Sequence, residues 1–254
     1  NGISVPTTWD ELNAAAEKLQ AAGIIPFAHG GQAWQDATVF EAVAMGIGGN
    51  NYYKNCYVDL KESCLRSETT VKVFDQMRKL QSYTDEGSPG RDWNVATGMV
   101  IEGKAGFQIM GDWAKGEFTA AGKVPGVDYY CAPTPSNNGY LYNVDSFIFY
   151  KTSDPEKQEG QKLLAKLMMG KNFQKVFNLY KGSIPARLDV PMDEFDKCAK
   201  TSNSDIKTAG ASGGLVPSFA HGMAQGNTMK AALQDIITEH FNSDMSSVDA
   251  ANAL

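Results

Sequence analysis

The order of helical and strand patterns between residues 93 and 120 constrains the fold of this chain most strongly. A helical pattern over residues 93–101 precedes the apolar strand pattern GFQIM at residues 106–110, and a new helix is predicted to begin near Asp112. Helices that alternate with short strands in this way are typical of an α/β protein in which helices cover the faces of a sheet.

The turn after this strand, Gly-Asp-Trp, brings Asp112 and Trp113 to the end of the strand. Strand ends are where an open α/β sheet presents side chains to a ligand. An indole ring can cover the apolar C–H face of a sugar, and a carboxylate accepts hydrogen bonds from sugar hydroxyl groups. Two interpretations stay open here: a sugar-binding platform, or a core tryptophan preceded by an aspartate that caps the new helix.

Capping residues and hydrophobic periodicity predict the remaining elements. Thr8 is the predicted N-cap of the first helix, Glu11 completes a capping box, and Gly23 ends the helix. Further helices are predicted over residues 36–45, 69–82, 155–169, 172–181 and 228–241. Strands are predicted over residues 24–28 and 141–150, and turns or connections over residues 46–55, 126–139 and 210–214.

Composition and charge argue against several classes of protein. A hydrophobic content of 43% and a charged content of 20% are ordinary for a globular chain of 254 residues. The net charge of −6 argues against nucleic acid or an anionic membrane as a partner. No apolar run approaches the roughly 20 residues that span a bilayer.

The four cysteines suit an oxidising compartment such as a periplasm, because their number is even. Cys56 and Cys64 flank a short loop that a disulfide could close. A bond between Cys131 and Cys198 would close a long loop, which stabilises more in the chain-entropy model. Four buried thiols remain the alternative. No CxxC pair or histidine neighbour at zinc spacing is present, so neither a metal nor a cofactor is predicted.

Asn143 and Asp145 form a second polar group. Alternation along the predicted strand at residues 141–150 places both side chains on one face. An amide and a carboxylate at this spacing can bind adjacent hydroxyl groups. A solvent-facing strand edge is the alternative interpretation.

Other candidate residues lie in two turns and one loop. Lys181 and Arg187 belong to KGSIPAR at the end of a predicted helix, where positive charge also offsets the helix dipole. His221 lies in the turn FAHG, and His29 and Trp34 lie in AHGGQAWQ, where Trp34 offers another stacking face. Each histidine is equally well interpreted as a structural residue.

One enzyme motif is present. Residues 210–214 fit G-x-S-x-G around Ser212, and Asp235 and His240 follow in the order of a serine hydrolase. That motif requires a strand before the serine and a helix after it. Because a polar stretch precedes Ser212 and a second glycine follows, we interpret the segment as a flexible turn with a chance match, and we predict no enzyme.

The segments VPTTWDEL, HGGQAWQD, GRDWNVATGMVIEGKAGFQIMGDWAKGEF, NVDSF, KGSIPAR and FAHG follow one another in this order. Together they resemble the sugar-binding proteins of bacterial ABC importers, and most closely the proteobacterial glucose/mannose-binding proteins. The resemblance extends over essentially the whole chain. It implies a periplasmic-binding-protein fold of type II, whose two hinged lobes close on one sugar, and delivery of that sugar to a permease in the inner membrane.

The resemblance assigns roles to five residues. Trp113 would supply a stacking face, and Asn143 and Asp145 would bind sugar hydroxyl groups. Lys181 and His221 would complete the polar contacts. Secondary positions are Trp34, Asp112 and Arg187. A disulfide between Cys131 and Cys198 also resembles one of the family, and glucose is the sugar the resemblance favours.

The N-terminus departs from the family pattern, which has a further long stretch before the VPTTWDEL helix that forms most of the first lobe. We therefore expect residues 1–138 and 187–254 to form the second, C-terminal lobe. Residues 139–186 are expected to cross the hinge and normally to pack on the N-terminal lobe. A single-lobe interaction module, or a fragment that does not bind sugar, remains the alternative.

Overall fold

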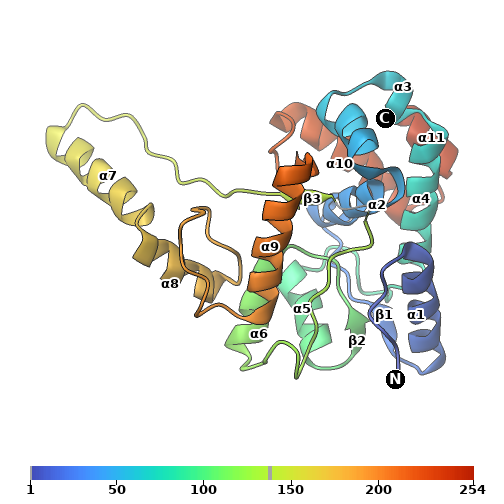
Figure 1. Cartoon of the computed structure of the whole chain (residues 1–254). Coiled ribbons are helices and arrows are strands. Elements are labelled where there is room, and N and C mark those ends of the chain that lie inside the picture. Colours follow the sequence, from blue (N-terminus) through green and yellow to red (C-terminus); the bar gives the residue numbers. More distant parts are fainter. Residues whose placement is uncertain (1, 137–138) are drawn as a thin grey trace.

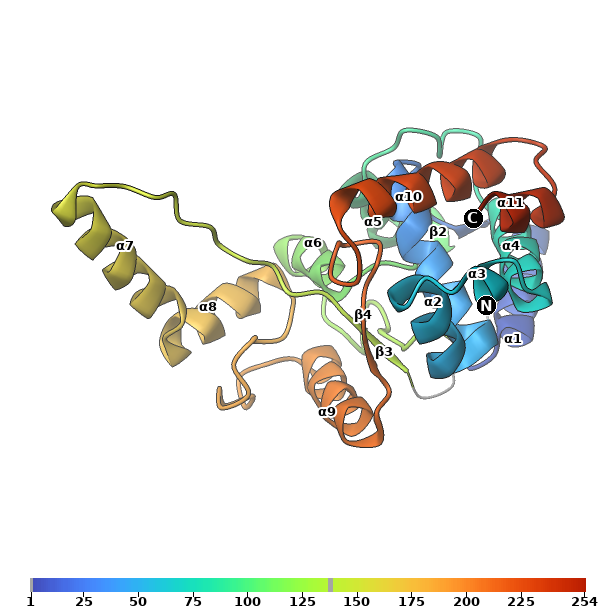
Figure 2. The ribbon, with the colours of Figure 1, turned by 90° about the horizontal axis from the view of Figure 1, so that it is seen from above.

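The computed structural model describes residues 2–136 and 139–254 of the chain. Most helices gather in one body, and a helical arm projects from it (Figures 1 and 2). None of the helices described is long and apolar enough to cross a membrane.

The first helix, α1 (Trp9–Ala21), begins where the capping box predicts. The Glu11 N–H donates to Thr8 Oγ1 at 3.2 Å, and the Glu11 carboxylate accepts from the Thr8 N–H at 3.3 Å. Strand β1 (Ile25–Phe27) follows and pairs in parallel with β2 (Ala105–Phe107). The strand predicted over residues 106–110 is confirmed only at residues 106 and 107, because β2 begins one residue earlier and ends three residues earlier.

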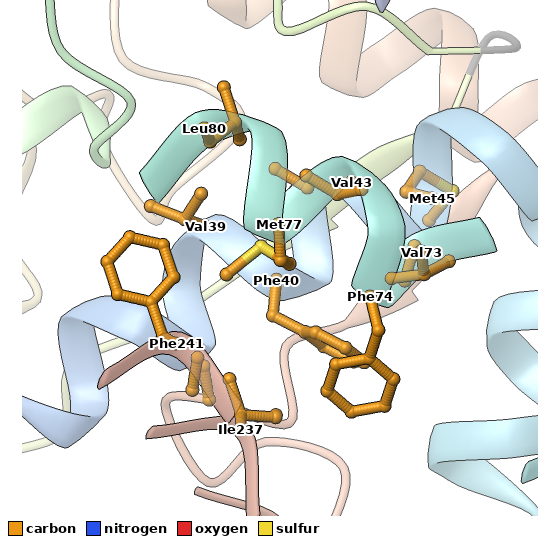
Figure 3. Close-up of a cluster of buried hydrophobic side chains, with 14 of the residues drawn as sticks. Val39, Phe40, Val43, Met45, Val73, Phe74, Met77, Leu80, Ile237 and Phe241 are labelled. Carbon is orange, nitrogen blue, oxygen red and sulfur yellow. The ribbon is translucent and has the colours of Figure 1, made fainter. Parts of the chain in front are cut away.

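The core lies between helices from distant parts of the sequence. Phe40 and Val43 from α2 pack with Phe74 and Met77 from α4 and with Phe241 from α10 (Figure 3). Burying a side chain of this size contributes about 1.5–3 kcal/mol. The helices of this core are α2 (Ala33–Tyr53), α4 (Glu68–Gln81), α10 (Asn227–Asn242) and α11 (Ser247–Ala253). The last of these, α11, is not predicted from the sequence.

Helix α2 is longer than predicted, because residues 46–53 are helical and not a turn. Residues 35–45 of α2 are buried without interruption, so tertiary packing of the helix outweighs the low helix propensity of the glycines that follow. Gly49, at φ 75°, is a kink within the helix. The π-helical turn η1 (Lys54–Val58) and α3 (Glu62–Leu65) follow, and the predicted disulfide Cys56–Cys64 joins them.

The Gly-Asp-Trp turn joins short elements. Helix α5 (Trp93–Ile101) has the predicted bounds and leads into β2. After the strand, the 3₁₀ turn η2 (Asp112–Ala114) runs directly into α6 (Lys115–Ala120). The predicted order of helix, strand and helix is confirmed.

The strand predicted over residues 141–150 is wrong beyond its second residue. Strand β3 (Tyr140–Tyr142) pairs in parallel with β4 (Leu215–Pro217), and both end together. After Tyr142 the described segment has no neighbouring strand, so residues 143–150 run along the arm without strand pairing, and residues 144–150 are exposed (Figure 2). The argument from strand alternation for Asn143 and Asp145 therefore fails.

The arm consists of residues 143–181 and includes α7 (Pro155–Met168) and α8 (Lys171–Lys181), both close to their predicted bounds. Its apolar side chains are unusually exposed. They include Phe147, Ile148, Tyr150, Leu163, Leu164, Leu167, Met169, Val176 and Tyr180. An apolar surface of this extent is typical of a face that packs against another protein surface.

Helix α9 (Lys197–Ser212) corrects the prediction of a flexible turn at residues 210–214. Asp196 caps the helix by accepting from the Ala199 N–H at 2.8 Å, and Gly213 ends it in a left-handed conformation. The predicted disulfide Cys131–Cys198 ties the start of α9 to the connection that follows α6.

Candidate functional site

The Trp113 ring lies over the backbone of its own turn. A Cβ atom at Gly111 would lie 2.1 Å from this ring, so only glycine allows the indole to fold back in this way. Trp113 remains partly exposed. The residue before it, Asp112, does not cap η2 through its side chain, because the turn already includes Asp112. The capping role considered for Asp112 is therefore wrong.

Asp112 instead joins two turns. Its carboxylate accepts a hydrogen bond from the Ile184 N–H at 3.3 Å, in the turn KGSIPAR. Burial raises the pKa of Asp112 above its usual value, and the hydroxyl of Ser183 and the Ile184 N–H partly offset this effect. Asp112 therefore joins two turns through a contact between residues that are 72 positions apart in the sequence.

His221 contacts both candidate stacking residues. Its ring lies edge-on to Trp113, with ring centroids 5.2 Å apart, and edge-on to Trp34, with centroids 6.1 Å apart. These three side chains come from α2, η2 and the turn after β4. The structure thus assembles one aromatic cluster from three predicted site residues.

The turn that carries His221 is fixed on helix α2. The Ala220 N–H donates to the buried Glu41 carboxylate at 3.2 Å, and the Phe219 N–H donates to the Tyr53 hydroxyl at 3.0 Å. Burial, with the Glu41 charge adding to it, raises the pKa of Tyr53 well above its usual value. Glu41 and Tyr53 thus hold the His221 turn from within the core.

Lys181 and Asp145 meet across the arm and form an ion pair. The Lys181 side chain is 27% exposed and that of Asp145 is 63% exposed, so water screens much of their attraction. The Lys181 ammonium also lies 6.0 Å from the centroid of the Phe177 ring. Two predicted site residues are therefore paired with each other before any ligand binds.

Two glycines connect this pair to the Trp113 turn. A Cβ atom at Gly182 would lie 2.6 Å from the Gly116 nitrogen, and one at Gly116 would lie 2.9 Å from the Lys181 carbonyl oxygen. The end of α8 therefore lies directly against the start of α6. This contact explains why Gly116 in the segment GDWAKG and Gly182 in the segment KGS are both glycines.

Asn143 adjoins the His221 turn through the backbone. It follows Tyr142, whose carbonyl oxygen accepts from the Ser218 N–H at 3.0 Å. Arg187 lies outside the cluster. Its guanidinium forms a bidentate pair with Asp189, at 2.8 Å for both bonds, and donates to the Met169 carbonyl at 3.1 Å. The Asp189 carboxylate raises the pKa of Arg187.

Sequence reasoning missed Glu41 and Ser218, which hold His221 in place. Ser218 Oγ lies 2.7 Å from Glu41 Oε1 and 2.9 Å from His221 Nδ1. One signal for Glu41 was available, because it is a charged residue in an otherwise apolar helical segment, and buried charges need partners. Ser218 carries no comparable signal.

The other histidines and the hydrolase motif have no part in this cluster. His29 Nε2 lies 2.7 Å from the buried Asp36 carboxylate, so it is a structural residue. Ser212 is the last residue of a helix and a strand follows it, which is the reverse of the order that the hydrolase motif requires. Among the described residues, no group of histidine, cysteine or acidic side chains could hold a metal ion.

Comparisons with known proteins agree with this architecture. Residues 1–168 match the family model described as bacterial extracellular solute-binding protein. A "probable sugar-binding periplasmic protein" of Brucella suis is 47% identical over the whole chain, and one of Rhizobium meliloti is 45% identical. The chain spans 60% and 61% of the length of these two relatives.

A solved structure named chitin oligosaccharide binding protein superposes on 98% of this chain and 63% of its own, with a TM-score of 0.76 and 18% identity. This likeness confirms the predicted α/β fold of the type II-like periplasmic binding proteins. The relatives, which are named probable sugar-binding periplasmic proteins, confirm the predicted periplasmic location and agree with the prediction that the chain is not an enzyme.

Proposed function

The chain belongs to the family of bacterial extracellular solute-binding proteins, and from this premise we propose that it binds a monosaccharide for an ABC importer. The observation that carries the proposal is the cluster of Trp113, Trp34 and His221, beside the Lys181–Asp145 pair. Aromatic faces next to paired charges suit a ring that has apolar C–H faces and hydroxyl edges. Glucose is the sugar we propose.

In this proposal the sugar stacks on Trp113. Its hydroxyl groups bond to His221, Lys181, Asp145 and Asn143, and Trp34 lines the same site. Hydrogen bonds to charged groups contribute about 1.5–3 kcal/mol each, so a few of them reach the roughly −8 kcal/mol of micromolar binding. Asp112 acts by holding the turns together, and Arg187 lies outside the site.

We propose that residues 139–186 belong to the hinge and to the packing surface of an N-terminal lobe, whereas residues 1–138 and 187–254 form the C-terminal lobe. The exposed apolar side chains of the arm support this division. It is also supported by the Brucella suis relative, because the match covers only 60% of that protein. A sugar that contacts both lobes binds their closed arrangement better and so favours closure. The closed form would then dock on the permease.

A sugar titration followed by tryptophan fluorescence tests the proposal. We expect a saturable change with glucose, at an affinity weaker than micromolar for this chain, since a second lobe would add contacts. Galactose, mannose and xylose, titrated in parallel, rank the specificity. A flat response to all four sugars would contradict the proposal.

Asp145→Ala should weaken glucose binding at least about tenfold, because the sugar loses a charged acceptor and Lys181 loses its partner. Asp193→Ala removes an exposed carboxylate outside the site and is the matched control. Unchanged affinity in Asp145→Ala would remove Asp145 from the site.

A further inference from the structure

Glu41 is a carboxylate in the core, with 3% of its surface exposed. Its hydrogen-bond neighbours among the described residues are all donors, and His221 Nδ1 also lies 3.5 Å from Glu41 Oε1. Ser218 Oγ lies 2.7 Å from Glu41 Oε1, and the Tyr53 hydroxyl and Ala220 N–H lie 3.0 and 3.2 Å from Glu41 Oε2. A buried carboxylate surrounded by donors is satisfied as an ionised acceptor.

The proton of Ser218 therefore points to Glu41. A hydroxyl has one proton and two acceptor lone pairs, so Ser218 Oγ can only accept from its other neighbours. These neighbours are the His221 N–H at 3.1 Å and His221 Nδ1 at 2.9 Å. His221 must then carry a proton on Nδ1.

The opposite arrangement is unfavourable. If Ser218 donated to His221 Nδ1, the oxygens of Ser218 and Glu41 would face each other at 2.7 Å without a proton between them. A buried acceptor would then lose a hydrogen bond, which is unfavourable because no water replaces it. The geometry therefore selects one tautomer of His221.

The other ring nitrogen, Nε2, accepts no hydrogen bond from the hydroxyl group that lies near it. That neighbour is Thr38 Oγ1 at 3.5 Å, a long separation for a hydrogen bond. The Thr38 hydroxyl already donates its proton to the Trp34 carbonyl at 2.8 Å. In the neutral ring, Nε2 thus accepts no hydrogen bond from the described part of the chain and lies beside Trp34 and Trp113.

We propose that Glu41 and Ser218 are positioning residues that hold His221 as its Nδ1–H tautomer, so that Nε2 accepts a hydrogen bond from a sugar hydroxyl. The identity of the ligand rests on the function proposed above, whereas the tautomer does not. The hydrogen bonds from His221 through Ser218 to Glu41 thereby orient a ligand-binding imidazole from inside the core.

Nitrogen-15 NMR of the histidine rings, recorded without sugar at mildly alkaline pH, tests the tautomer. The chain has three histidines, and His221→Gln identifies the His221 signals by their loss. We expect a proton on Nδ1 of His221. His29 is the internal reference with the opposite tautomer, because its Nε2 faces the Asp36 carboxylate at 2.7 Å. A proton on Nε2 of His221, or on both nitrogens, would overturn the proposal.

Two variants test the positioning role. Glu41→Gln replaces an acceptor by an amide that can donate to Ser218, so the serine proton should turn toward Nδ1 and the His221 proton should move to Nε2. Ser218→Ala removes the intermediate oxygen and should abolish the preference for Nδ1–H. Glu239→Gln, on the exposed face of α10, is the matched control and should leave His221 unchanged. An unchanged His221 tautomer in both Glu41→Gln and Ser218→Ala would refute the role.

Sugar affinity separates this proposal from the proposed function. Glu41→Gln should bind glucose roughly three- to tenfold more weakly, the loss expected for one hydrogen bond. Because the tautomer is measured without ligand, a wrong tautomer counts against the positioning residues alone. The predicted tautomer together with no sugar binding would overturn the sugar as the ligand of Nε2.

Discussion

Gly182 and Gly116 determine how closely the arm approaches the Trp113 turn. Gly182 has φ +89°, a conformation that L side chains rarely adopt, and it ends helix α8 in the left-handed region. Its neighbour across the contact is the Gly116 backbone, which cannot move aside as a flexible side chain would. The position of Lys181 relative to Trp113 therefore depends on two residues that have no side chain.

Gly182→Ala should lower the free energy of unfolding by about 1–3 kcal/mol, because it combines backbone strain with a clash at the Gly116 nitrogen. Urea denaturation measures this loss. Gly210→Ala, inside α9 with open space around it, is the matched control and should instead add about 0.5–1 kcal/mol. Equal stability of the two variants would contradict the close contact.

The lowered pKa of His240 predicts that the free energy of unfolding depends on pH. Burial, with a smaller effect of the Arg78 charge, lowers its pKa to about 4. In the unfolded chain His240 has an ordinary pKa near 6.5, so it is protonated there at a higher pH than in the folded chain. The free energy of unfolding therefore has its full value above about pH 6.5 and falls as the pH decreases toward 4. The expected loss over this window is about 3 kcal/mol.

His240→Phe should flatten the stability profile between pH 6.5 and 4, since a phenylalanine fills the ring site beside Phe74 without titrating. Denaturation with urea at a series of pH values provides the comparison. A variant that loses stability as steeply as the parent over this window would show that another group is responsible.

At the scale of elements, local capping and periodicity predicted most helices, because these signals lie within a few residues. Helix α1 follows its capping box, α5 has its predicted bounds, and α7 begins at its predicted first residue, Pro155. Packing decides the exceptions. Gly46 and Gly48 are helical because α2 packs in the core, whereas Gly49 interrupts the helix with a kink. The polar segment at residues 197–212 is helical although we interpreted its end as a turn.

Strand length and the assembly of the site also depend on contacts between distant residues, which local signals do not contain. The strand beginning at residue 141 stops at Tyr142, because β4 offers partners only as far as Pro217. Trp113 and His221 were predicted as separate candidates, and the structure brings them together. The roles of Glu41 and Ser218 depend on contacts 177 residues apart, which no local pattern contains.

The two disulfides should differ in their effect on stability. Cys131–Cys198 closes a loop of 67 residues that contains the whole arm, whereas Cys56–Cys64 closes one of 8. The chain-entropy model gives about 4 and about 2.5 kcal/mol respectively. Double serine variants of each pair, compared by urea denaturation, should rank in this order. A larger loss on removing Cys56–Cys64 would contradict this account.

In the whole molecule, packing within the body does not account for the exposed apolar surface of the arm. Figures 1 and 2 show α7 and α8 extending away from the core. Leu163 and Leu167 lie in an apolar hollow between these helices and are 60% and 61% exposed. Such a surface fits the proposed packing on a second lobe.

Replacing Leu163 and Leu167 together by lysine should reduce the binding of a hydrophobic dye and change the free energy of unfolding by no more than about 0.5 kcal/mol, as expected for surface positions. Val248→Lys replaces an exposed residue of α11, away from the arm, and should leave dye binding unchanged. A large loss of stability in the double variant would show that the arm packs on the body.

We propose that a monosaccharide binds against Trp113, and the indole N–H signals of the four tryptophans test this claim directly. In a glucose titration followed by nitrogen-15 NMR, the signals of Trp113 and Trp34 should shift and saturate together. Trp9, whose indole N–H is buried in the core, and Trp93, which begins α5, should stay in place. A Trp113 signal that does not move with glucose, galactose, mannose or xylose, or four signals that move alike, would contradict the claim.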